Sequence, residues 1–112
     1  LPGSYFEISK NFPFIIETEF ESYVKPKGYS LYVCSYGKAC INRMPKSWSI
    51  VGLNDKNKWI KIDERKKIIN WENNQKQYFE LKKTDTFSKI RIIVNELKDS
   101  EILRIENISF YN

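Results

Sequence analysis

A window without acidic residues holds the groups best suited to bind a ligand. Neither Asp nor Glu occurs from Ser22 to Asn54, and this window contains five basic residues, namely Lys25, Lys27, Lys38, Arg43 and Lys46. The chain has nineteen basic residues, so the other fourteen balance all fourteen acids and the window accounts for the formal net charge of +5. Basic groups interleaved with tyrosine and tryptophan suit an anionic partner: phosphate, a sulfated sugar, an acidic lipid surface or nucleic acid. Taken alone, five cations over 33 residues are more typical of a solvated face.

Catalysis is not expected from these residues. The chain has no His, which excludes Ser-His and Cys-His nucleophile pairs and makes a zinc site very unlikely. No phosphate-binding Gly-x-x-x-x-Gly-Lys occurs, and neighbouring carboxylates such as Asp63 and Glu64 are interpreted as solvent-facing charge. We therefore predict no catalytic and no metal-ligating residue.

The two cysteines and the apolar segments say little about the compartment. Cys34 and Cys40 lie six residues apart, so a disulfide across that short loop is geometrically feasible, but its redox state stays open. No run approaches the roughly 18 apolar residues that a membrane-spanning helix needs. No transmembrane segment is predicted, and the localisation is left unknown.

The elements that must position these groups are predicted to be β-strands. Phe14, Ile16 and Phe20 alternate with Glu17 and Glu19, which gives one buried face and one wet face. The same alternation predicts strands at Tyr29–Val33, Trp48–Gly52, Trp59–Ile62, Tyr78–Leu81, Ile90–Val94 and Ile102–Tyr111. Short strands at this spacing favour an all-β sandwich or barrel. A length of 112 residues fits one domain.

Two segments break the alternation. In the last strand Leu103 and Ile105 have one parity while Ile108 and Phe110 have the other, and a bulge near Glu106 would keep all four in the core. Between Asp63 and Trp71 the spacing of the apolar residues allows one turn of helix.

Three segments carry a family resemblance. Residues Pro45–Asp63 contain Pro-x-x-Trp, then Gly-x-Asn-Asp and a second Trp. Phe87–Ile92 has an aromatic-x-x-Ile-Arg strand, and Leu103–Tyr111 ends in Ile-x-Phe-Tyr. In this order the motifs resemble the discoidin family, also called the coagulation factor 5/8 type C domain, within the galactose-binding-like superfamily. The resemblance implies an antiparallel jelly-roll β-sandwich and a non-catalytic binding module.

The resemblance also has departures. The family domain usually extends further at its amino end, so we interpret residues 1–112 as one shortened discoidin-like domain excised from a larger protein. Many secreted members join their two ends by a disulfide, and no Cys lies near Asn112. This tilts the expected setting slightly towards the cell interior, with the cell surface or the extracellular space as the alternative. A structural calcium is allowed by the resemblance, but the sequence does not support it, and no other cofactor is expected.

The residues that carry the resemblance are interpreted as structural. Trp48 and Trp59 are each expected to be buried, with the indole N–H on a backbone partner. Asn54 and Asp55 suit a turn, and Arg91 is expected to pair with a carboxylate or to cap loop carbonyls. The full structural set is Trp48, Asn54, Asp55, Trp59, Arg91 and Phe110.

The predicted ligand contacts lie in the loop Ser35–Met44. The resemblance implies that the loop after the Tyr29–Cys34 strand touches ligands, and this loop falls inside the acid-free window. Tyr36 is predicted to stack on the ligand or insert into it, and Lys38 and Arg43 to contact anions. Asn42 is predicted as a hydrogen-bonding group, and the predicted contact set is completed by Lys46. Ile41 and Met44 either pack beneath the loop or, in a lipid-binding version, point outward.

Three functions remain in competition. The first is a recognition and adhesion module that binds glycans or anionic phospholipid headgroups through loops at one end of the sandwich. The alternative is an intracellular domain for protein–protein interaction or scaffolding. Nucleic-acid binding ranks last because no recognition-helix or RNA-binding sheet signature accompanies the basic pI of about 9.2.

Overall fold

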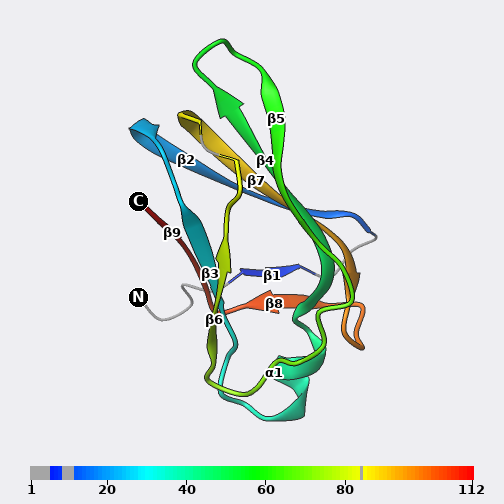
Figure 1. Cartoon of the computed structure of the whole chain (residues 1–112). Helices are drawn as coiled ribbons and strands as arrows, with labels where there is room; N and C mark the ends of the chain where they lie inside the picture. The colour runs from blue at the N-terminus through cyan, green and yellow to red at the C-terminus, as the bar shows by residue number, and fades with distance from the viewer. Residues whose placement is uncertain (1–5, 9–11, 84) are drawn as a thin grey trace.

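The fold was determined as a computed structural model that describes residues 6–8, 12–83 and 85–112, and these are mostly β-strands (Figure 1). One short helix, α1, spans Lys38–Asn42. The strands are β1 (Phe6–Ile8), β2 (Phe14–Val24), β3 (Gly28–Tyr32), β4 (Pro45–Asn54), β5 (Trp59–Arg65), β6 (Lys76–Glu80), β7 (Phe87–Leu97), β8 (Leu103–Ile105) and β9 (Asn107–Tyr111). No helix among the described residues is long and apolar enough to span a membrane.

The strands form antiparallel sheets that pack as a sandwich. One sheet has the order β2-β7-β4-β5, the second has the order β6-β3-β9, and β1 pairs with β8. Figure 1 shows α1 at one end of the molecule and the turn between β4 and β5 at the opposite end. The prediction of an all-β antiparallel sandwich is confirmed.

The core follows the predicted alternation. Phe14 and Ile16 of β2 are buried while the neighbouring Ile15 and Glu17 face outward. Trp48 and Ile50 of β4 are buried in the same way. Because successive strand residues point to opposite faces, each strand of the four-stranded sheet contributes one apolar row to the space between the sheets.

A chain of polar groups crosses this core and links the two sheets. The Trp48 indole Nε1 donates a hydrogen bond to the Tyr29 hydroxyl (2.8 Å), and that hydroxyl donates to Asp63 Oδ2. The same carboxylate accepts from Arg65 Nε (3.0 Å), and Arg65 Nη2 donates to the Glu80 carbonyl (2.8 Å). Burial, and then the hydrogen bond to Asp63, raise the pKa of Tyr29 well above its usual value. Tyr29 therefore stays a neutral donor between the sheets.

Trp59 differs from its prediction. The side chain is 39% exposed, so the expectation that it is buried is wrong. Trp59 pairs with Leu53, whose two neighbours Gly52 and Asn54 are buried. Leu53 therefore faces away from the core, and cross-strand partners share a face. Trp59 therefore lies on the outer face, where the Arg91 guanidinium sits 4.1 Å from its ring centroid. The carboxylate partner of Arg91 is Glu17, at 2.7 Å.

The other structural residues occupy a turn and the core edge. Asn54 Oδ1 accepts hydrogen bonds from the backbone N–H groups of Lys56 and Lys58, both at 3.0 Å, which closes the turn that contains Asp55. Phe110 is partly buried and packs edge-on against Phe20, with ring centroids 5.9 Å apart. The indole partner of Trp48 is a side-chain hydroxyl rather than the predicted backbone group.

The two irregular segments also differ from prediction. The last strand is not one bulged strand, because β8 pairs with β1 while β9 pairs with β3, and Glu106 lies between them. The apolar positions shift by one residue because the chain leaves one sheet and enters another there. Between Asp63 and Trp71 no helix forms, because pairing with β4 continues β5 to Arg65. Trp71 is buried and its Nε1 donates to the Pro45 carbonyl (2.8 Å).

Candidate functional site

The chain between β3 and β4 is a short, cross-linked loop. Cys34 and Cys40 form a disulfide, with Cα atoms 5.3 Å apart, and both residues are buried. The bond returns the chain onto itself, and α1 begins directly after Gly37, whose φ of 85° favours glycine. The Tyr36 amide donates to Cys40 Sγ at 3.1 Å. The predicted contact loop therefore contains one short helix and the disulfide that the sequence left open.

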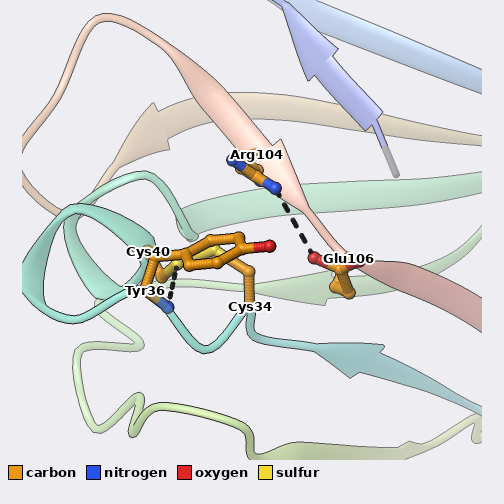
Figure 2. Close-up of a disulfide and its surroundings, with 5 residues drawn as sticks. All are labelled: Cys34, Tyr36, Cys40, Arg104 and Glu106. Carbon is orange, nitrogen blue, oxygen red and sulfur yellow. Dashed lines mark hydrogen bonds and ion pairs between the residues drawn. A yellow bond between two sulfur atoms is a disulfide. The ribbon is translucent and has the colours of Figure 1, made fainter. Parts of the chain in front are cut away.

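Tyr36 is the most exposed large hydrophobic side chain of the described residues (73% exposed), although its backbone is held. Figure 2 shows its ring beside the disulfide, with Arg104 of β8 and Glu106, which follows β8, on the neighbouring segment. The Arg104 guanidinium lies 5.2 Å from the ring centroid, and Arg104 Nη2 lies 3.8 Å from Glu106 Oε1. Tyr36 therefore presents an exposed aromatic ring with two charged side chains beside it.

A hollow of about 290 Å³ lies next to Tyr36. The residues that line it include Tyr32, Asn74 and Glu106. The Tyr32 hydroxyl donates to Asn74 Oδ1 (2.6 Å), and the Glu106 amide donates to the Tyr32 carbonyl (2.8 Å). The first contact orients the phenol of Tyr32 and the side-chain amide of Asn74, and the second holds the backbone of Glu106 next to Tyr32. Such a mixture can accept and donate hydrogen bonds to a small polar ligand.

Of the predicted contact residues, only Tyr36 lines this hollow. Lys38 is exposed on α1, and Lys46 of β4 pairs with Glu96 at 3.5 Å. Asn42 and Arg43 end α1, and their carbonyls accept from the amides of Asp99 (2.9 Å) and Arg104 (3.1 Å). These two backbone contacts join α1 to the segment that leads into β8.

Ile41 and Met44 pack beneath the loop. Met44 is fully buried, and Ile41 packs against the core. Neither side chain projects as the lipid-binding version would require.

Sequence reasoning missed Arg104, Glu106 and Asn74 because they are distant from the loop along the chain, and it missed Tyr32 because that residue belongs to the strand before the loop. One signal was available for Arg104, since it lies between the buried residues Leu103 and Ile105 and therefore points away from the core. Asn74 had no comparable signal because it belongs to an irregular segment.

A metal centre finds no support in the part of the chain that the structure describes. Within residues 6–8, 12–83 and 85–112, no three His, Cys, Asp or Glu side chains gather as ligands.

The disulfide is expected to stabilise both the fold and the position of Tyr36. Replacing Cys34 and Cys40 together by alanine should lower the free energy of unfolding by about 2 kcal/mol, the loop-closure term for so short a loop. Urea unfolding of the variant and the wild-type chain measures this difference. Equal midpoints and slopes for the two proteins would contradict the expectation.

The arrangement of the sheets defines the class of fold as an antiparallel β-sandwich. No protein-family model matches the chain, and no curated protein matches it either. Several solved structures, in contrast, match the chain. The family 32 carbohydrate-binding module of Streptococcus pneumoniae EndoD matches with a TM-score of 0.79 at 11% identity, over 96% of this chain and 75% of that one.

Two further matches come from Clostridium perfringens. The family 32 module of NanJ in complex with galactose has a TM-score of 0.78 at 14% identity, over 96% of this chain and 76% of that one. Another family 32 module, in complex with GalNAc-β-1,3-galactose, has a TM-score of 0.75 at 12% identity, over 96% and 75%. At these identities the likeness establishes the fold.

Proposed function

We propose that residues 1–112 act as one discoidin-like, non-catalytic module that binds glycans at the loop end of the sandwich. The observation that carries this proposal is the Tyr36 ring, 73% exposed yet tied by its amide to the disulfide, beside a polar hollow. The structural neighbours support it, because two of them were solved with galactose or a galactose-containing disaccharide.

A sugar ring matches the chemistry of this surface. One face of a hexose presents C–H groups, which pack on an aromatic ring, and its rim presents hydroxyls. Tyr36 offers the ring, while Glu106, Asn74 and Tyr32 offer hydrogen-bonding groups at the same hollow. Binding sites of this kind combine an apolar wall with a few oriented polar groups.

A neutral sugar suits the hollow better than an acidic headgroup. The carboxylate of Glu106 lies 3.8 Å from Arg104 Nη2, so the two charges offset each other and no surplus of positive charge attracts a phosphate or carboxylate group. The cations predicted as anion contacts, Lys38, Arg43 and Lys46, lie outside that lining. They are therefore assigned a secondary role around the site.

The proposal is tested by replacing Tyr36 with alanine. Loss of the ring is expected to weaken binding of galactose or N-acetylgalactosamine glycans at least tenfold, which corresponds to about 1.4 kcal/mol. A glycan array identifies the best glycan, and isothermal titration calorimetry then gives the affinities. The matched control is Tyr23→Ala, because Tyr23 is also exposed (55%) but lies on β2.

Full affinity in Tyr36→Ala would overturn the assigned site. If the wild-type chain binds no glycan but sediments with acidic liposomes in a salt-sensitive way, and Lys38→Glu with Arg43→Glu abolishes this, the lipid alternative replaces the proposal. Silence in both assays favours the protein-partner alternative.

A further inference from the structure

The outer face of the three-stranded sheet carries a second exposed aromatic surface. Tyr78 of β6 is 63% exposed, and its ring centroid lies 5.4 Å from that of Tyr111 on β9. Between these strands runs β3, in which Ser30 pairs with Tyr78 and Gly28 pairs with Tyr111. Paired residues share a face, so only a hydroxymethyl group and a hydrogen atom lie under the two rings. The small side chains of β3 let the rings meet above it.

Ser30 and Gly28 of β3, which lie beneath the two rings, hold this surface in place. Ser30 is 2% exposed and its Oγ lies 2.8 Å from the Tyr111 hydroxyl, within hydrogen-bond distance. A Cβ atom at Gly28 would approach the Phe79 carbonyl oxygen to 2.8 Å, so no larger residue fits at this position. The ring of Tyr111 is thus oriented before any ligand arrives, which reduces the entropic cost of binding.

A hollow of about 360 Å³ opens at this surface. Tyr78 and Tyr111 line it together with Gly28, and Lys27 and Glu80 add one positive and one negative charge. A volume near the lower end of small-molecule pockets, roughly 300–1,000 Å³, fits a single ring better than an extended peptide. Aromatic walls with balanced charges suit a neutral ligand that has an apolar face and hydroxyl groups.

We propose that this surface, the tyrosine platform (Gly28, Tyr78, Glu80 and Tyr111), is a second sugar-binding site that takes one neutral hexose residue. The inference rests on the proposed glycan-binding function, but it concerns a different place. Gly28 begins β3 and Tyr32, which lines the hollow at Tyr36, ends it. Four residue steps of a strand separate them by about 13 Å. One oligosaccharide of a few residues spans that distance, so two weak contacts combine into tighter binding.

The test follows backbone amide signals by NMR in the full 112-residue chain. Galactose, N-acetylgalactosamine, glucose and mannose are titrated separately into the ¹⁵N-labelled protein. At least one sugar is expected to shift the amides of Gly28, Ser30 and Tyr78. The variant Tyr78→Ala should weaken that response at least tenfold while leaving the response of the Tyr36 loop unchanged. Tyr23→Ala, an exposed tyrosine on β2, should leave both responses unchanged.

The two sites report independently, so the two proposals fail separately. If the Tyr36 loop responds and the platform amides stay silent with all four sugars, the platform inference is overturned and the proposed function stands. If only the platform responds, the loop assignment fails and the platform inference is supported. A platform response that survives Tyr78→Ala also overturns the inference. The inference is also overturned if a proline-rich peptide shifts the amide signals of Gly28, Ser30 and Tyr78 while none of the four sugars does.

Discussion

Replacing Trp48 by alanine is expected to lower the free energy of unfolding by about 3–5 kcal/mol, the range for a buried aromatic residue. Trp48 is 1% exposed, and its ring lies 5.1 Å from Phe79 and 6.2 Å from Trp71. The truncation leaves a cavity between the sheets. It also removes the indole N–H that donates a hydrogen bond to the Tyr29 hydroxyl. Small domains are stable by only about 5–15 kcal/mol, so much of the total is lost. Urea unfolding followed by far-UV circular dichroism measures the change.

Trp59 provides the matched control for this prediction. It is also a tryptophan of the β4–β5 hairpin, but it is 39% exposed and packs under Arg91. Trp59→Ala should cost about 0.5–1 kcal/mol, the strength of an exposed cation–π contact. Equal losses in the two variants would show that the burial of Trp48 does not decide its role.

Replacing Asp63 by alanine is the second large effect that we expect, a loss of about 2–4 kcal/mol. Breaking a buried ion pair costs about 3–5 kcal/mol, and the lower figure here reflects partial solvation of the partner. The side chain of Asp63 is 10% exposed and that of Arg65 is 29% exposed. The variant leaves the buried Tyr29 hydroxyl without its acceptor and Arg65 without its carboxylate. Guanidinium chloride unfolding gives the loss.

Two comparisons sharpen this experiment. Asp55→Ala removes an exposed carboxylate in the turn after β4, and it should change stability by less than about 0.5 kcal/mol. In a Tyr29→Phe background, Asp63→Ala should cost less than in the wild type, because the hydroxyl that needs the acceptor is gone. Purely additive losses would contradict the linked hydrogen-bond chain.

The sequence predicted the sheets well because their alternation is local. Phe14, Ile16, Trp48 and Ile50 are buried where period-two spacing places them. The same spacing did not predict that Trp59 is exposed, because the face on which Trp59 lies depends on its cross-strand partner, Leu53. Nor did the spacing predict that the chain changes sheet at Glu106. The buried positions shift by one residue there because β8 pairs with β1 and β9 pairs with β3.

The candidate site shows the same division. Tyr36 was predicted from its place in a loop that the family resemblance and the acid-free window both select, and the structure finds its ring exposed beside a hollow. Its neighbours Arg104 and Glu106 come from about seventy residues further along, and Asn74 comes from an irregular segment. The residue types and periods along the chain therefore determined which faces are apolar and hence the class of fold. Only the tertiary structure decided which polar side chains meet, because that depends on how the sheets and loops pack across long sequence separations.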